Sequence, residues 1–227
     1  MGKFDAEATV SSHLQRLGGL VLVLLAVPAC GRGKEVAPTL LSEGFNGAFP
    51  GTTWTAPVLT GTATAQPDGG NGFPAPSLKM STTAATASAT TQTVMAFNNP
   101  SLTLAVHLAD LSGAATELGS GAISILDATP AVVASATWNN ATGMITFHIN
   151  GGAADATIAA AADGTFHRFV FNVSAAGMAT WSFDNGAAAV TQAGFPAGLL
   201  KIQLSASFGT GTAWPSFFFD NVSASSP

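Results

Sequence analysis

The sequence predicts an all-β protein, a sandwich or a barrel, and three observations carry this prediction. Apolar and polar residues alternate along many short segments, which is the pattern of strands that bury one face. Clusters of Asn, Asp and Gly, which tolerate the backbone angles of tight turns, separate these segments. No long stretch with helical periodicity follows residue 30. Many short strands at this spacing are typical of β-sandwiches and β-barrels.

An apolar run precedes the predicted domain. Residues 17–27 (LGGLVLVLLAV) are long enough for the core of a signal peptide but short for a membrane span. The chain's one cysteine, Cys30, follows this run and the small residue Ala29. No disulfide can therefore form within the chain. A lone cysteine in this position resembles the lipobox of bacterial lipoproteins, in which the thiol is lipidated and becomes the new N-terminus.

This resemblance implies a signal peptide over residues 1–29, forming an N-terminal helix, and a lipidated Cys30 with a tether over 30–41. It also implies an anchor in the membrane of the bacterial cell envelope. Gly31, rather than aspartate, follows the cysteine, which favours the outer membrane or cell surface. Two alternatives stay open: ordinary cleavage near Ala29, which gives a secreted protein, and an uncleaved helix with a buried cysteine.

Composition limits the partners of the mature chain. Removal of 29 of the 227 residues leaves 198, which suits one domain with a sizeable core, predicted over 42–225. Charged residues make up only 8% and the net charge is −5, so nucleic acid is not an expected partner. The surface must consist mainly of hydroxyl, amide and small side chains, a composition that recurs in extracellular β-proteins that bind uncharged polymers.

The predicted strands follow one another at short intervals. The clearest alternation covers residues 102–109, 144–149, 168–173, 179–184 and 201–208. The turns between them are predicted at 139–143, 150–152, 163–164, 175–177 and 184–186. Residues 153–162 (AADATIAAAA) fit a helix, or a strand with a loop, about equally well. Residues 61–93 predict long loops with one or two short strands, such as Ser77–Met80.

Three segments together suggest a more specific architecture. Residues 41–54 (LSEGFNGAFPGTTW) look like an opening strand and turn, and residues 217–223 (FFFDNVS) like a closing strand. Between them, 164–173 (GTFHRFVFNV) and 179–186 (ATWSFDNG) look like a paired hairpin. Together they resemble the concanavalin A-like lectin/glucanase superfamily in its LamG-like relatives. The resemblance implies a two-sheet antiparallel β-sandwich, a jelly roll, with strand 43–49 beside strand 217–223.

Alternation also assigns side chains to the core or to the surface. We expect the core between the sheets to contain Phe169, Phe171, Trp181, Phe183 and Leu204. On the same strands, outward positions are expected for His148, Arg168, Asn172 and Gln203. These outward residues are the first candidates for contact with a ligand.

No catalytic residue is expected. Glycosidases of this superfamily carry paired acids two residues apart on one strand, and hydrolysis needs two carboxyl groups. No two acids after residue 30 have this spacing, and the motifs G-x-S-x-G, H-E-x-x-H and C-x-x-C are absent. The sequence therefore predicts a protein that is not an enzyme. A hydrolase or lyase of the same fold remains the enzymatic alternative.

The predicted function is a non-catalytic binding or adhesion lipoprotein at the cell surface that recognises a glycan or another extracellular polymer. Trp138 and Trp214, next to predicted loops, are candidates for stacking on sugar rings. His148, Arg168 and Gln203 are candidates for hydrogen bonds with sugar hydroxyls. A purely structural envelope protein with no small ligand is a further alternative.

A structural calcium ion is the one candidate cofactor. Related carbohydrate modules often hold Ca²⁺ between the first and last strands, and this resemblance implies Glu43, Asn46 and Asp220 as oxygen ligands. The alternative is that Glu43 is solvated and that Asp220 serves the local turn. Because the ligand set is small, the alternative is favoured.

Overall fold

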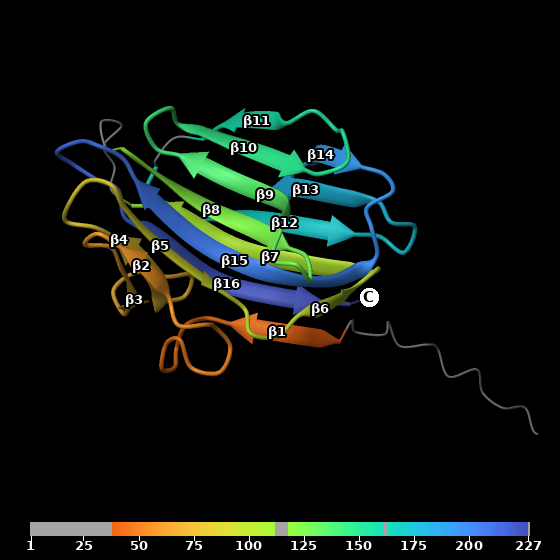
Figure 1. The fold of residues 1–227 in the computed structure, drawn as a ribbon, viewed down its shortest axis with the longest axis horizontal. Helices are drawn as coiled ribbons and strands as arrows, with labels where there is room; N and C mark the ends of the chain where they lie inside the picture. The colour runs from red at the N-terminus through yellow and green to blue at the C-terminus, as the bar shows by residue number, and fades with distance from the viewer. Residues whose placement is uncertain (1–37, 112–117, 161–162, 227) are drawn as a thin grey trace, which may run out of the picture. The chain divides into compact units, whose positions relative to one another are not determined.

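The computed structural model describes residues 38–111, 118–160 and 163–226. The segment Val36–Pro227 forms a compact unit by itself, and its described residues form sixteen strands. These strands build two antiparallel sheets that lie one behind the other in Figure 1. No helix of the described residues is long and apolar enough to span a bilayer. The predicted signal helix and Cys30 lie outside the described residues.

The first sheet, named sheet I, has eight strands around β16. Its order is β14 (Ala188–Gln192), β13 (Ala179–Phe183), β12 (His167–Val173), β7 (Leu102–Asp110), β16 (Phe217–Ser225), β4 (Ser77–Ser81) and β3 (Thr64–Asp68), with β1 (Thr39–Glu43) also paired to β16. Strands β12 and β13 pair as an antiparallel hairpin, which confirms the predicted pairing of residues 164–173 with 179–186.

The second sheet, named sheet II, has eight strands around β15. Its order is β11 (Ala156–Ala159), β10 (Met144–Ile149), β9 (Val132–Asn139), β8 (Gly119–Leu126), β15 (Gly198–Phe208), β5 (Ala87–Gln92) and β2 (Val58–Thr60), with β6 (Phe97–Asn99) also paired to β15. The predicted two-sheet antiparallel sandwich is thereby confirmed.

The first and last strands are neighbours, as predicted, but the first strand lies earlier in the chain. Strand β1 pairs with β16 from Thr39 to Glu43, so the predicted strand over 43–49 is wrong. Gly44 and the left-handed Phe45, with φ of 54°, break the extended backbone immediately after β1. Strand pairing also begins before residue 42, the predicted start of the domain.

Two segments for which the sequence did not clearly predict strands contain strands in the structure. The region 61–93 contains β3, β4 and β5, one strand more than predicted, and β4 matches the predicted short strand at Ser77–Met80. Within 153–162, the residues Ala156–Ala159 pair with β10 as strand β11. Tertiary pairing has overridden the helix propensity of this alanine-rich stretch.

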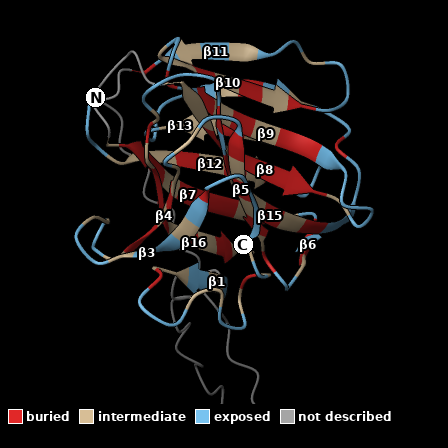
Figure 2. Ribbon diagram, turned by 60° about the vertical axis from the view of Figure 1, so that its left-hand side comes forward, coloured by how far each residue is buried: buried red, intermediate tan, exposed pale blue. Residues whose placement is uncertain are grey.

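The core lies between the sheets, where Figure 2 shows buried residues concentrated along the strands and exposed residues in the connecting loops. Phe169, Phe171, Trp181 and Leu204 are all buried, as predicted. Phe183 differs, since it is only half-buried at the end of β13, where its ring stacks on a histidine ring.

The two sheets approach closely at one glycine. A Cβ atom on Gly121 of β8 would lie 2.6 Å from the ring of Phe217 on β16, which is closer than carbon atoms approach in proteins. Only a residue without a side chain fits here, so Gly121 lets the aromatic ring fill the space between the sheets.

Candidate functional site

Outward side chains of sheet II form three polar rows that cross its strands. In β15, Ile202, Leu204 and Ala206 are buried, so the residues between them point outward. Strand register places each outward residue beside a counterpart on the neighbouring strands. The rows are Gln92–Gln203–Ser124–Ser135–His148, then Thr90–Ser205–Ala122–Thr137–Thr146, and then Ser88–Ser207–Ser120–Asn139–Met144. We call this surface the polar face.

The polar face offers hydrogen-bonding groups with almost no charge. Hydroxyl and amide side chains can each donate and accept, and adjacent strands repeat them about every 4.8 Å. None of the eight strands of sheet II contains an aspartate or a glutamate. Lys201 and His148 are the basic residues of these strands. The surface suits a neutral ligand that is rich in hydroxyl groups.

Two hollows lie at the margins of the polar face. The first, of about 320 Å³, lies where β15, β5 and β2 meet. Its lining residues are Thr55, Ala56, Val58, Thr90, Thr91, Gln92 and Gln203. We call it the glutamine hollow. The second, of about 310 Å³, lies toward the far end of β15 and includes Ser120, Asn139 and Ser207.

Some polar side chains of sheet II are already hydrogen-bonded to each other and others are not. Ser120 and Ser207 hydroxyls lie 2.8 Å apart and bond to each other, as do Thr60 and Ser88 hydroxyls at 2.9 Å. By contrast, the side-chain amides that line the glutamine hollow have no hydrogen-bond partner among the described residues. The two glutamine amides are therefore available to a ligand, whereas the hydroxyl groups of Ser120, Ser207, Thr60 and Ser88 are already paired.

His148, on β10, ends the first row on the side of sheet II opposite the glutamine hollow. Its Nδ1 lies 2.6 Å from Asp155 Oδ1 and its Nε2 lies 2.7 Å from Asn150 Oδ1. The Asn150 amide donates to the Val132 carbonyl at 3.0 Å, which leaves its oxygen as the atom that faces the ring. Both ring nitrogens thus face acceptors, an arrangement that the protonated ring satisfies. The hydrogen bond to Asp155, and then the one to Asn150, raises the pKa of His148 above its usual value.

The structure places two of the predicted ligand residues, His148 and Gln203, on the same face and the third, Arg168, on the other sheet. His148 and Gln203 lie in the same row of the polar face, with β8 and β9 between their strands. Arg168 lies on β12 of sheet I. The prediction of one polar strip containing all three residues is therefore wrong. Alternation along each strand identified the outward side chains, but not the sheet to which each strand belongs.

Trp138 is wrongly predicted as a ligand residue. Strand β9 continues to Asn139, so Trp138 follows Ala134 and Ala136 on the inward face and has 0% exposure. Its ring packs edge-on against His167, with ring centres 5.3 Å apart. A ring in this position cannot stack on a sugar.

Trp214 is also committed to packing. The ring is half-buried and lies against the core cluster, and its Nε1 donates to the Gly209 carbonyl at 2.9 Å. Trp214 thus holds the turn that follows β15, and it lies outside both hollows of the polar face.

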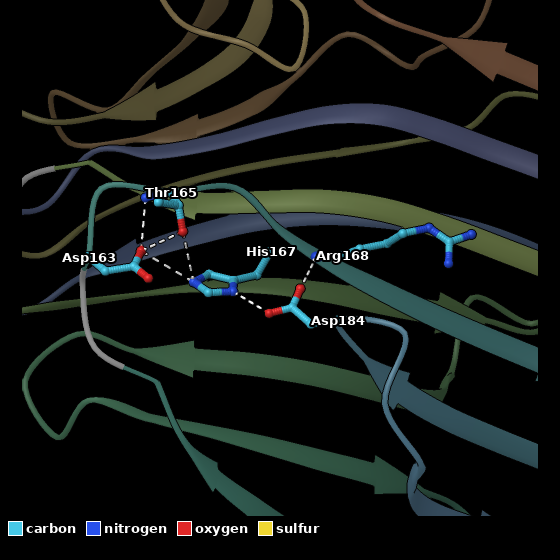
Figure 3. A network of polar contacts seen from close by, with 5 residues as sticks. All are labelled: Asp163, Thr165, His167, Arg168 and Asp184. Atoms are coloured by element: carbon cyan, nitrogen blue, oxygen red, sulfur yellow. Dashed lines mark hydrogen bonds and ion pairs between the residues drawn. The ribbon is translucent and has the colours of Figure 1, made fainter.

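Figure 3 shows the polar network of sheet I that surrounds His167. His167 Nδ1 lies 2.6 Å from Asp184 Oδ2, and its Nε2 lies 3.3 Å from Asp163 Oδ1. The Thr165 hydroxyl donates to Asp163 at 2.7 Å, which lowers the pKa of that carboxyl group. The Arg168 side chain leaves this network and donates to Asn185 at 2.8 Å. These contacts tie the start of β12 to the turn that precedes it and to the turn that follows β13, a structural role that sequence analysis did not predict.

Sequence analysis also missed residues of the polar face. Ser124, Ser135 and Gln92 lie in its first row. The residues on either side of Ser135 in β9, Ala134 and Ala136, point inward. Because alanine is small, the apolar–polar alternation along β9 is weak in the sequence. Gln92 ends a strand in the segment predicted to be mostly loop. Weak alternation hid Ser135, and the loop-like composition around β5 hid Gln92.

The candidate calcium ligands lie near the junction of β1 and β16. Asp220 is fully buried, and burial raises the pKa of its carboxyl group, with the charge of Glu43 adding to this effect. Asp220 accepts hydrogen bonds from the backbone N–H groups of Phe73 and Asn221, and Glu43 accepts one from Phe45 at 2.7 Å. No group of three or more His, Cys, Asp or Glu residues that could hold a metal occurs among the described residues. The chemistry of two carboxylates and an amide oxygen from Asn46 still fits a hard cation.

Comparison with known proteins places the fold. No family model matches the sequence, and no curated protein matches it significantly. Solved structures do match. A carbohydrate-binding module, CBM66 from Bacillus subtilis, is 12% identical, with a TM-score of 0.51 over 77% of this chain and 96% of that chain. An endo-1,3-β-glucanase from Streptomyces sioyaensis is 13% identical, with a TM-score of 0.58 over 86% of this chain and 99% of that chain.

A third similar structure is a Bacillus subtilis protein of unknown function with a galectin-like fold. It is 10% identical, with a TM-score of 0.56 over 83% of this chain and 96% of that chain. Together these similarities show that the fold is the concanavalin A-like lectin/glucanase jelly roll, as the sequence resemblance implied. The neighbours include a binding module and a glucanase, so this fold accommodates both binding and hydrolysis.

Proposed function

We propose that this protein binds a glycan, or another neutral extracellular polymer, on the polar face of sheet II. The observation that carries the proposal is the set of three rows, made up mostly of hydroxyl and amide side chains, that lie in register across five strands. Carbohydrate-binding and glycan-active proteins among the structural neighbours support a role with glycans in general. Hydrogen bonds to a flexible, well-hydrated polymer give modest affinity, so a dissociation constant between about 1 μM and 1 mM is expected.

We further propose that this binding is not accompanied by catalysis. Hydrolysis of a glycosidic bond needs two carboxyl groups that flank it. The strands that form the polar face carry neither aspartate nor glutamate, and the Asp155 carboxylate beside the face is already bonded to His148. These features favour a binding module over a hydrolase or lyase.

The proposed location is the bacterial cell envelope, with the mature chain anchored through a lipid on Cys30. The support is the sequence pattern alone, an apolar run that ends at Ala29 and a lone cysteine. A lipid anchor beside a binding domain would hold the neutral polymer against the cell surface.

We also propose that Ca²⁺ binds Glu43, Asp220 and Asn46. Two neighbouring carboxylates, one of them fully buried, lie at this junction, and a hard divalent cation would offset their repulsion. The ion would have a structural role, because it joins the loop after β1 to β16 of sheet I, away from the polar face.

The proposed function is tested by removing hydroxyl groups from the middle row while keeping side-chain shape. The variant Thr137→Val with Ser205→Ala, titrated with soluble neutral glucans by calorimetry, should bind about tenfold more weakly, because two hydrogen bonds are lost. The control is Thr180→Val, an outward threonine on β13 of sheet I, which should leave binding unchanged. Unaltered affinity in the double variant would rule out the polar face as the binding surface.

A further inference from the structure

The glutamine hollow has a more specific chemistry than the rest of the polar face. Gln92 on β5 and Gln203 on β15 are directly paired across the strands, so their Cβ atoms lie about 5 Å apart. Both side chains line the hollow, and neither amide is bonded to a described residue. Each amide offers a carbonyl acceptor and an NH₂ donor. The floor of the hollow thus presents two unpaired amide groups side by side.

One wall of the hollow is apolar and firmly held. Val58 and Ala56 line it, and Val58 is 68% exposed. The backbone before them is fixed to β5, because Thr55 N donates to the Gln92 carbonyl at 2.9 Å and the Thr91 hydroxyl donates to the Thr55 carbonyl at 2.8 Å. An anchored apolar wall beside free amides suits a ligand group that is itself part amide and part methyl.

We propose that the glutamine hollow recognises the acetamido group of an N-acetylated sugar, an inference that rests on the proposed function of the polar face. The acetamido N–H donates to one glutamine carbonyl, and its carbonyl accepts from the other glutamine NH₂. The methyl group packs against Val58 and Ala56. A hollow of about 320 Å³ leaves room for the sugar ring that carries the group, since ligand pockets begin at about this size.

The charges around the hollow favour the acetylated form over the free amine. Among the described residues, none that lines the hollow is charged, so an ammonium group would lose water there without gaining a counter-ion. Lys201 lies two residues before Gln203 on β15 and points to the same face, so its charge repels a cationic sugar. A plain hydroxyl in place of the acetamido group would leave the two glutamine amides less well satisfied.

Three tetrasaccharides test the proposal with the purified full-length chain: the β-1,4-linked tetramer of N-acetylglucosamine, the same tetramer after deacetylation, and the corresponding glucose tetramer. By calorimetry, the acetylated tetramer should bind at least about tenfold more tightly than the other two, because two hydrogen bonds depend on the acetamido group. Gln92→Ala and Gln203→Ala should each remove most of this preference. The control Gln66→Ala, an exposed glutamine on β3 of sheet I, should keep it.

A substitution that adds a negative charge to the hollow should reverse the preference for the acetylated tetramer. Gln203→Glu replaces the amide with a carboxylate, so the deacetylated tetramer should gain affinity while the acetylated tetramer loses it. Unfolding temperatures of all variants, matched to that of the unaltered chain, confirm that only the hollow has changed.

The outcomes separate this proposal from the one on which it rests. If the acetylated and glucose tetramers bind equally and the Thr137→Val, Ser205→Ala variant weakens both, the polar face binds glycans and the acetamido proposal is wrong. A preference for the acetylated tetramer that survives both glutamine substitutions would also overturn it. If neither the tetramers nor soluble glucans bind, both proposals are wrong.

Discussion

Trp181 joins the two sheets, and its replacement provides a quantitative test of the fold. The ring belongs to β13 of sheet I, is 1% exposed, and packs against Phe171 of β12 and Phe147 of β10, with ring centres 5.1 Å and 6.2 Å away. Its Nε1 also donates to the backbone carbonyl of His148 on β10 of sheet II, at 3.1 Å. Replacement of Trp181 with phenylalanine removes the hydrogen bond and keeps most of the packing, whereas replacement with alanine removes both.

Trp181→Ala should lower the free energy of unfolding by about 3–5 kcal/mol, because it leaves a cavity at the centre of an aromatic cluster. Trp181→Phe keeps most of the packing but leaves the His148 carbonyl without its donor, which should cost about 1–3 kcal/mol. Trp214→Phe is the matched control, since this half-buried ring bonds one carbonyl at the margin; its cost should be about 1 kcal/mol.

Urea unfolding of the purified chain, followed by circular dichroism, measures these differences. The order of the three variants matters more than any single value, since cavity costs vary with how far the surroundings relax. A Trp181→Ala cost no larger than that of Trp214→Phe would mean that Trp181 does not join the sheets.

Further predictions concern the edge of the polar face, the metal and the lipid anchor. Because the folded pKa of His148 is raised, its bonds to Asp155 and Asn150 should stabilise the fold below about pH 6.5 and lose this effect as pH rises through the raised value. The stability difference between the unaltered chain and His148→Gln, measured by thermal unfolding at several pH values, should shrink accordingly; a difference that grows with pH would contradict this. Millimolar Ca²⁺ should raise the unfolding temperature of the unaltered chain relative to chelator but not that of Asp220→Asn, and equal shifts in both would exclude Asp220 as a ligand. Intact mass should show the mature chain beginning at a diacylglyceryl Cys30, and Cys30→Ala should release the protein or block its maturation; an unmodified N-terminus elsewhere would contradict the lipid anchor.

Local alternation was sufficient to predict much of the fold. Successive side chains of a strand point to opposite faces, so a clear apolar–polar alternation assigns each residue without knowledge of its neighbours in space. Phe169, Phe171 and Leu204 were correctly assigned to the core in this way, and His148 and Gln203 to the surface. Trp138 was wrongly assigned because its position next to the predicted turn was taken to mean exposure, whereas it lies on the inward face of β9.

The candidate site could not be predicted from the sequence to the same extent. Its rows depend on which strands are neighbours and in what register, and both depend on contacts between residues far apart in the chain. Gln92 and Gln203 are brought together only because β5 pairs with β15, whereas Arg168, equally outward on its strand, belongs to sheet I. A strand's alternation is a local property of the backbone, and the sequence determined it. The sheet that each strand joins is decided by the packing of the whole core, so only the tertiary structure shows which polar side chains share a face.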